Sequence, residues 1–290
     1  MKVPYYPGCL PYSRTIGLNL PMKAIANALE MELIEIQGIC CGAFFTTNPA
    51  DMYGPVRTLL DAKKAGDELM TTCVLCYNVL KQTNSTMKRD SKKREQVNTF
   101  MGENYNGEVK VIHFLEFLRD KIGFDRLNRY VKVGLQGLKV APYYGCLLLR
   151  PYEEIKLDDP EHPTIFEDFL MSIDCEPVDF PYKTECCGSY LAAVSFDAVI
   201  EHSYSIINSA LTSGAEAIVV ACPLCHFNID QMQEKVRLKY EGLNEVPIFY
   251  FTQLLAIALG IKEAPLGFEQ HYVNPYPWLI KKLGSISQRF

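Results

Sequence analysis

The 290-residue chain lacks the short motifs that mark several large classes of enzyme. It contains no Walker loop, no Gly-x-Gly-x-x-Gly after a predicted strand and no Ser-His-Asp signal. It also lacks the Cys-x-x-Cys-x-x-Cys-x-x-x-Cys-Pro run that holds cubane clusters in ferredoxins. The sequence therefore predicts neither nucleotide-driven nor triad chemistry, and we expect any relay of electrons over distance to need a partner that carries cubane clusters.

A surplus of basic residues and a long apolar run are missing too. The 34 Asp and Glu residues outnumber the 29 Lys and Arg residues, and the net charge of -5 argues against a nucleic-acid partner. The longest apolar stretch, Ile248–Ile261, is interrupted by Thr252 and Gln253 and is too short to span a bilayer. No signal peptide opens the sequence. We therefore expect a soluble, cytoplasmic protein, because thiols stay reduced in that compartment.

Cysteine, by contrast, is abundant, and ten of the eleven cysteines form one pattern that occurs twice. Each array has an isolated cysteine, then Cys-Cys-Gly, then Cys-x-x-Cys. The first array consists of Cys9, Cys40, Cys41, Cys73 and Cys76, and the second of Cys146, Cys186, Cys187, Cys222 and Cys225. The gaps between groups are 30 and 31 residues in the first array and 39 and 34 in the second. Gaps of this length must be closed by a folded domain and not by a loop.

Five thiols per array are one more than a structural zinc ion or a cubane iron-sulfur cluster uses. Metal or cluster ligation is favoured over redox-active thiols and inert core cysteines, because scattered core cysteines would not repeat their order. A disulfide framework suits small secreted domains, whereas this chain is long and 48% hydrophobic. Cys175 stands outside both arrays and is predicted to be a buried apolar residue.

The repeat extends beyond the cysteines. Residues 2–9 and 139–146 are both apolar runs that end in Gly-Cys, and Val111–Leu118 matches Ile248–Leu255. Both pairs are offset by 137 residues, which indicates duplication of a whole unit. We therefore predict an α/β fold of two repeated halves, residues 1–137 and 138–266, followed by a C-terminal tail over residues 267–290.

Hydrophobic periodicity predicts the elements of each half. The expected elements are a helix over Gly17–Met31, a strand over Leu33–Ile36, a helix over Pro49–Ala65 and strands over Glu68–Thr72 and Ala217–Ala221. Alternating strands and helices predict a mainly parallel sheet in each half. Ligands of such sheets bind beyond the carboxyl ends of the strands, which is where the sequence puts the cysteines.

These motifs resemble those of the cysteine-rich CCG domain proteins, in particular the B subunit of heterodisulfide reductase from methanogenic archaea. The resemblance rests on Cys-Cys-Gly at 40–42 and 186–188, on both Cys-x-x-Cys pairs and on the isolated Cys9 and Cys146, and it covers nearly the whole chain. It implies two noncubane [4Fe-4S] clusters, each bound by one set of five cysteines. It does not identify the catalytic residues beyond these ten ligands.

The resemblance also implies a function, which is reduction of the mixed disulfide of coenzyme M and coenzyme B to two thiols. A disulfide takes two electrons and a cluster typically passes one, so two clusters match the stoichiometry. The implied partners are a ferredoxin-like C subunit and, through it, a hydrogenase or formate dehydrogenase and a flavin-containing A subunit. Family members also serve lactate, glycolate, succinate and fumarate metabolism, so a subunit of such an oxidoreductase is one alternative. A noncatalytic zinc-binding or electron-transfer scaffold is another.

Some residues near the motifs allow more than one interpretation. The anionic groups of the two coenzymes imply a cationic entrance, and the sequence does not choose among Arg14, Arg150, Lys81 and Lys183. The basic stretch over residues 88–94 predicts a solvated helix, with a docking surface as the alternative. His226 is predicted to be an ordinary helix-start residue, although it could donate a proton near a cluster.

The tail has an amphipathic and basic composition. Its apolar and aromatic residues include Tyr272, Tyr276, Trp278, Leu279, Ile280, Leu283, Ile286 and Phe290, and its basic residues include Lys281, Lys282 and Arg289. We expect the tail to pack on the protein and to help seat an iron-sulfur partner subunit. Contact with a lipid surface is the alternative.

Overall fold

Two separate, wholly parallel sheets of four strands each form the framework of the computed structural model, which describes residues 1–8, 16–262 and 264–284. The first sheet contains β1 (Lys2–Tyr5), β2 (Glu32–Glu35), β3 (Glu68–Thr71) and β4 (Lys110–His113). The second contains β5 (Lys139–Tyr143), β6 (Glu176–Pro177), β7 (Ala217–Val220) and β8 (Ile248–Tyr250). The strand orders are β2-β1-β3-β4 and β6-β5-β7-β8, so every strand has a counterpart at the same place in the other sheet. The predicted α/β fold with two repeated halves is confirmed, while the exact segment boundaries stay a prediction.

Helices connect the strands of both halves. In the first half these are the short turn η2 (Ile16–Leu18), α1 (Met22–Ala28), α2 (Pro49–Ala65), α3 (Val74–Arg89), α4 (Ser91–Met101), α5 (Phe114–Phe117), the π-turn η3 (Leu118–Ile122) and α6 (Phe124–Asn128). In the second half they are α7 (Tyr152–Ile155), α8 (Ile165–Ser172), the 3-10 turn η4 (Ser189–Ala193), α9 (Phe196–Thr212), α10 (Pro223–His226), the π-turn η5 (Phe227–Gln231), α11 (Gln233–Lys239) and α12 (Phe251–Ala258). The turn η6 (Phe268–Gln270) and α13 (Tyr276–Leu283) follow in the tail.

Local sequence explains where several helices begin. Asn48 accepts a hydrogen bond from the amide of Ala50 and Pro49 occupies the first turn, so α2 starts as a capped helix. The helix predicted over Gly17–Met31 is wrong in its extent. Pro21 separates η2 from α1 there, because proline has no amide to donate to a preceding turn.

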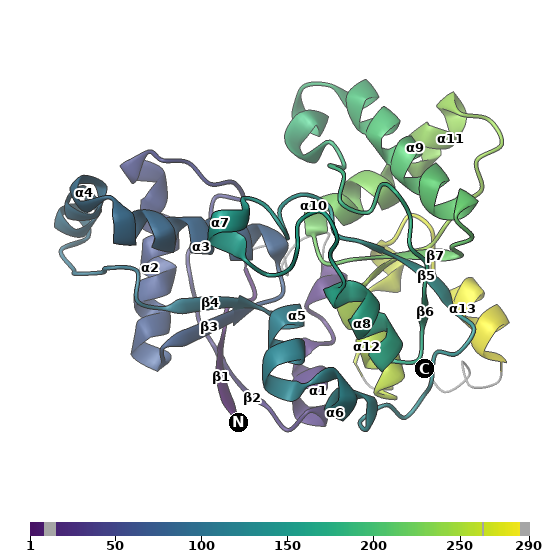
Figure 1. Ribbon diagram of the computed structural model, residues 1–290, viewed down its shortest axis with the longest axis horizontal. Coiled ribbons are helices and arrows are strands. Elements are labelled where there is room, and N and C mark those ends of the chain that lie inside the picture. Colours follow the sequence, from purple (N-terminus) through teal and green to yellow (C-terminus); the bar gives the residue numbers. More distant parts are fainter. Residues whose placement is uncertain (9–15, 263, 285–290) are drawn as a thin grey trace.

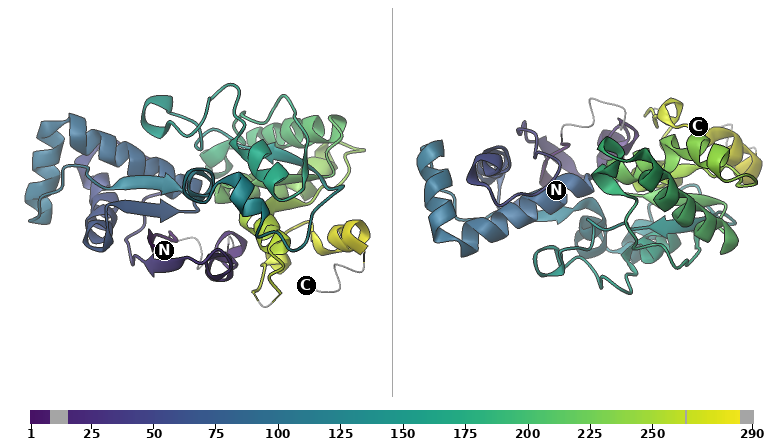
Figure 2. Two further views of the ribbon diagram at one scale, coloured as in Figure 1. Left: turned by 60° about the horizontal axis from the view of Figure 1, so that its bottom comes forward. Right: turned by 90° about the horizontal axis from the view of Figure 1, so that it is seen from above.

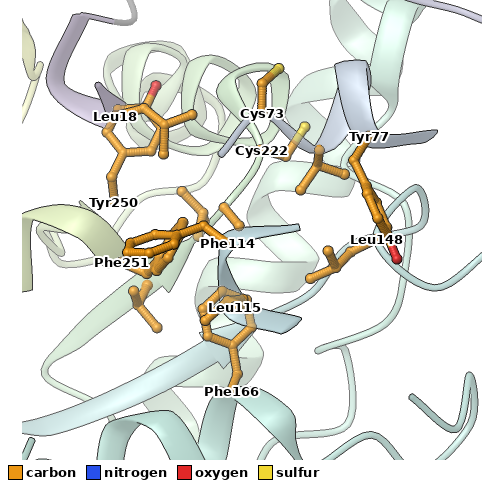
Figure 3. Packing of buried hydrophobic residues seen from close by; sticks show 14 of the residues in the cluster. Leu18, Cys73, Tyr77, Phe114, Leu115, Leu148, Phe166, Cys222, Tyr250 and Phe251 are labelled. Carbon is orange, nitrogen blue, oxygen red and sulfur yellow. The ribbon is translucent and has the colours of Figure 1, made fainter. Parts of the chain in front are cut away.

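The two halves share one hydrophobic core. Figure 1 shows the first sheet on the left and the second on the right, with α5, α8 and α12 between them. In the two further views of Figure 2, the first half (purple to blue) and the later part of the second half (green to yellow) again lie at opposite ends of the molecule. The ring of Phe251 from α12 lies 5.9 Å from that of Phe114 in α5 and 6.2 Å from that of Phe166 in α8 (Figure 3). This aromatic packing fixes the two sheets as one unit.

The tail packs on the second half over its described residues, as predicted. Leu279 and Leu283 are buried, and the Trp278 ring lies 5.6 Å from that of Phe249 in β8. Lys282 pairs with Glu216 just before β7. Ile286, Arg289 and Phe290 lie outside the described residues. No helix within the described ranges is long and apolar enough to cross a lipid bilayer.

Candidate cysteine metal centres

The described cysteines of the two arrays all follow the carboxyl ends of parallel strands. β3 ends two residues before Cys73, and β7 ends two residues before Cys222. Each Cys-x-x-Cys pair opens a helix, because α3 begins at Val74 and α10 begins at Pro223. The amides of a helix N-terminus stabilise negative charge, so both pairs are placed to carry thiolates. Cys9 lies outside the described residues.

Within each half the sulfur atoms converge. The Sγ atoms of Cys41 and Cys76 are 3.5 Å apart in the first half, and those of Cys187 and Cys225 are 3.6 Å apart in the second. Cys146 lies 3.8 Å from Cys186, measured between sulfurs. All of these distances exceed the roughly 2.05 Å of a disulfide bond, so none of these three pairs is a disulfide. Cys175 is buried outside both groups, which agrees with its prediction as an apolar core residue.

The two Cys-Cys-Gly loops have the same backbone conformation. Gly42 and Gly188 have φ angles of 83° and 88°, and the residues after them, Ala43 and Ser189, also have positive φ angles of 67° and 44°. This left-handed backbone turns amides toward the sulfurs. The Gly42 amide donates to Cys40 Sγ at 3.4 Å.

A second pair of glycines brings the backbone close to the last cysteine of each array. Gly8 and Gly145 have φ angles of 79° and 63°. A Cβ at Gly8 would lie 2.9 Å from the sulfur of Cys76, and one at Gly145 would lie 3.0 Å from the sulfur of Cys225. Neither place has room for a side chain.

Two equivalent tyrosines hydrogen-bond to the backbone just before the Cys-Cys pairs. The hydroxyl of Tyr6 donates to the carbonyl of Ile39 at 2.8 Å, and that of Tyr143 donates to the carbonyl of Glu185 at 2.7 Å. Each acceptor directly precedes a Cys-Cys pair. Sequence reasoning missed this role, although the two tyrosines are offset by 137 residues, like the rest of the repeat.

Close packing of thiols makes their ionisation interdependent. Hydrogen bonds from Cys146 and Cys187 lower the pKa of Cys186 to about 2. Contact with Cys187 and then with Cys222, together with burial, raises the pKa of Cys225 well above its usual value. Largely buried sulfurs this close cannot all become thiolates unless a cation compensates their charge. The donor set and its surroundings therefore fit a cationic iron-sulfur group.

The two sites face each other across the boundary between the halves. Tyr190, which follows the second Cys-Cys-Gly, donates a hydrogen bond from its hydroxyl to the carbonyl of Ala43, and its ring contacts Phe44 at 5.8 Å. Burial raises the pKa of Tyr250, and thiolate charge at Cys222 and then Cys73 raises it further. Figure 3 shows Cys73 and Cys222 on neighbouring segments above the shared aromatic core.

Solvent reaches the second site beside Cys186. A pocket of about 320 Å³ is lined by Cys186, Glu185, Tyr182, His202, Glu201, Ser205 and Ile206. The segment from η4 to the start of α9, which follows the second Cys-Cys-Gly loop, exposes the apolar side chains of Leu191, Val194 and Phe196. An external small molecule or partner surface can therefore approach within contact of a candidate ligand.

The basic residues considered for a cationic entrance are engaged within the protein. Lys183 bridges Glu167 at 2.7 Å and Asp179 at 2.8 Å. Arg150 pairs with Glu161, and Lys81 donates to the hydroxyl of Tyr77. Arg14 lies outside the described residues. The basic stretch over 88–94 spans the end of α3 and the start of α4 with mostly exposed side chains, which agrees with the predicted solvated helix.

His226 ends the short helix α10 and is buried. It lies with Asp230 and His271 in a group whose ligand-type atoms are within 4.8 Å of one another. The Gln253 amide nitrogen donates to the Leu266 carbonyl and contacts His271 Nε2 at 2.9 Å, so His271 Nε2 must be an acceptor. Its Nδ1 then carries the hydrogen that points at His226 Nε2, 3.3 Å away.

Burial supports the same assignment, because it lowers the pKa of His271 to about 4 and keeps the imidazole neutral. The carboxylate of Asp230 accepts from the amides of Tyr272 and Val273. These hydrogen bonds anchor the tail to the second half.

Comparisons with known proteins agree with this arrangement. The model of the CCG cysteine-rich domain family matches residues 3–81 and 140–230, one segment in each half. The B subunit of the ferredoxin/F(420)H(2)-dependent CoB-CoM heterodisulfide reductase of Methanosarcina acetivorans is 30% identical over 97% of this chain and 96% of its own length. The "8-methylmenaquinol:fumarate reductase membrane anchor subunit" of Wolinella succinogenes is 30% identical over 93% of this chain and 96% of its own length.

The fold also occurs in a solved structure. The crystal structure of a hypothetical protein from Helicobacter pylori matches with a TM-score of 0.73 and 13% identity, over 93% of this chain and 51% of that one. At this identity the likeness concerns the fold alone.

Proposed function

The chain belongs to the CCG cysteine-rich domain family, and on that premise we propose that it is an oxidoreductase subunit that reduces a disulfide at two iron-sulfur centres. The substrate we propose is the mixed disulfide of coenzyme M and coenzyme B. The relative from Methanosarcina acetivorans, which is named as part of a heterodisulfide reductase, supports this choice. We place the protein in the cytoplasm.

One observation carries the proposal: two equivalent sets of converging thiols face each other across the boundary between the halves. In each set a left-handed Cys-Cys-Gly loop and a helix-opening Cys-x-x-Cys bring sulfurs within 3.8 Å. We assign one noncubane [4Fe-4S] cluster to Cys9, Cys40, Cys41, Cys73 and Cys76, and a second to Cys146, Cys186, Cys187, Cys222 and Cys225. When bound, each cluster would supply one-electron redox chemistry beside the substrate.

The chain's own residues would shape the reaction space. Tyr190 closes the gap between the two Cys-Cys-Gly loops through its bond to Ala43. The aromatic core beneath Cys73 and Cys222 keeps water out from below (Figure 3). Breaking the disulfide bond takes two electrons and two protons and leaves two thiols, so one electron from each side satisfies the balance.

Electrons must come from outside the chain, since it carries no ferredoxin-type motif. We propose that the direct partner is a small ferredoxin-like protein of the same complex. A flavoprotein and a hydrogenase or formate dehydrogenase would stand upstream.

The test is anaerobic turnover of the iron-loaded chain with the mixed disulfide and a strong one-electron reductant. We expect both thiols to appear in equal amounts, measured by mass spectrometry, and oxidised glutathione to react far more slowly. A protein that holds its iron and yet forms no thiols would overturn the substrate assignment.

The second candidate is a subunit of a fumarate-reducing complex, which the 30% identity to the Wolinella succinogenes protein favours. In that case a flavoprotein that reduces fumarate should copurify with the chain, and the mixed disulfide should remain intact. Copurification from the native cell extract separates the two candidates.

A further inference from the structure

A buried asparagine contacts a sulfur of the second array. Asn228 lies in the π-turn η5, three residues after Cys225, and is fully buried. Its Nδ2 atom lies 3.1 Å from the carbonyl oxygen of Cys187, 3.1 Å from that of Ser189 and 3.4 Å from the sulfur of Cys187. Two carbonyl acceptors identify this atom as the amide nitrogen, because the amide oxygen could not bond to them. Its two N–H groups serve three acceptors, so the Cys187 sulfur receives a shared hydrogen bond from one of them.

The internal duplication provides a built-in comparison. The last cysteines of the two arrays, Cys76 and Cys225, are offset by 149 residues, so Val79 is the counterpart of Asn228. Val79 is buried in the continuous helix α3 and has no side-chain N–H to donate. The left-handed Cys-Cys-Gly loops are alike in both halves. The second array therefore has a side-chain donor that is missing at the equivalent place in the first.

Asn228 is a poor choice for packing alone. Its Oδ1 atom is buried without a hydrogen-bond partner. An orphaned buried acceptor destabilises the fold, because it loses its hydrogen bonds to water and gains none in return. Val79 shows that the fold accommodates an apolar side chain at the equivalent position, so the contact with the Cys-Cys loop is what distinguishes the asparagine.

We propose that Asn228 makes the two centres electronically unequal, an inference that rests on the proposed iron-sulfur function. A hydrogen bond to a ligand sulfur stabilises the more negative, reduced state of a cluster and so raises its reduction potential. The centre held by Cys187 then has the higher potential of the two, and the first electron delivered by a partner settles there. Asn228 acts through Cys187 and is a positioning residue, not a catalytic one.

The experiment compares Asn228→Val with the wild type, using the full chain purified without oxygen. Redox titration followed by electron paramagnetic resonance should show the midpoint potential of one centre lowered and that of the other unchanged, with iron content retained. Ser203→Ala is the matched control, since its hydroxyl donates to the backbone carbonyl of Asn228 at 2.8 Å and does not touch the sulfur. Its two midpoints should equal those of the wild type.

Unchanged midpoints in Asn228→Val, or an equal fall of both, would overturn the proposal. If Asn228→Val loses iron, its midpoint potentials cannot be compared, and a labelling experiment on the wild-type chain tests the hydrogen bond instead. Wild-type protein made with asparagine that carries ¹⁵N in its side chain should show a ¹⁵N coupling at one reduced centre in pulsed electron paramagnetic resonance. Absence of this coupling would contradict the proposal. Finding zinc in place of iron in the wild type would contradict the proposed iron-sulfur function itself. It would therefore be distinguishable from a failure of the Asn228 proposal alone.

Discussion

At the scale of single residues, glycine allows the backbone to pass close to a cysteine sulfur in each half. Replacing Gly145 by alanine places a Cβ 3.0 Å from the Cys225 sulfur, at a φ angle of 63°. We expect Gly145→Ala to lose iron from the second centre and to lower the unfolding temperature. Iron per chain and thermal unfolding are the measurements.

Gly102→Ala is the matched control for this change. Gly102 has nearly the same φ angle, 64°, and open space around it. Both variants carry the strain of a left-handed residue, about 1–2 kcal/mol, but only Gly145→Ala meets a sulfur. Equal iron contents in the two variants would show that crowding at Cys225 does not matter.

His113 makes the stability depend on pH. Its Nε2 lies 2.9 Å from the carbonyl oxygen of Thr72, its Nδ1 accepts from the Leu115 amide, and burial lowers its pKa to about 4. The unfolded chain takes up a proton near pH 6.5 and the folded chain does not until about pH 4, so stability falls as the pH falls through this window. Between pH 7 and pH 5 we expect a loss of about 2 kcal/mol from this group.

Denaturant unfolding of the wild type and His113→Gln at both pH values checks this. The variant should be less stable at pH 7 but should lose about 2 kcal/mol less on acidification. His226 and His271 remain in both proteins, so the difference isolates His113. Parallel losses in the two proteins would contradict the assignment of a neutral imidazole.

At the scale of elements, local patterns predicted most of the frame that carries the cysteines. Strand-like runs before Cys73 and Cys222 are β3 and β7, and the proline of Cys-Pro-Leu-Cys lies in the first turn of α10. The contacts that join the halves could not be predicted, because Tyr190 and Ala43 are 147 residues apart and no periodicity links them. The π-turn that contains Asn228 also has no local signal, since its sequence is compatible with an ordinary helix.

The tail is an element whose removal can be tested. Ending the chain after Ala264 removes the buried Leu279 and Leu283 and the two backbone amides that pair with Asp230. We expect a loss of several kcal/mol, since a buried leucine contributes roughly 2–5 kcal/mol and a buried carboxylate is left with fewer donors. Unfolding by denaturant measures this loss.

A chain that ends after Gly284 is the control, because it keeps every described contact of α13. It should be more stable than the chain that ends after Ala264, and the difference measures what residues 265–284 contribute. If the chain that ends after Ala264 is as stable as the full chain and still copurifies with an iron-sulfur partner, the tail neither supports the fold nor seats the partner.

At the scale of the whole molecule, each half closes its own set of thiols while the two halves share a core. The sulfur of Cys41 contacts that of Cys76 in the first half, and the sulfur of Cys187 contacts that of Cys225 in the second. Neither contact crosses the boundary between the halves. Cys41→Ser and Cys187→Ser should therefore each lose about half of the iron, one centre of the two. Cys175→Ser, outside both arrays, should lose none. Loss of all iron from a folded Cys41→Ser or Cys187→Ser chain would contradict one centre per half.

The central claim is that both arrays hold iron-sulfur clusters. Its most direct test is the iron, sulfide and zinc content of the chain purified without oxygen, together with its electron paramagnetic resonance spectrum. Two four-iron clusters predict about eight iron atoms and about eight sulfides per chain. About two zinc ions per chain with little iron, one in each half, would contradict the account.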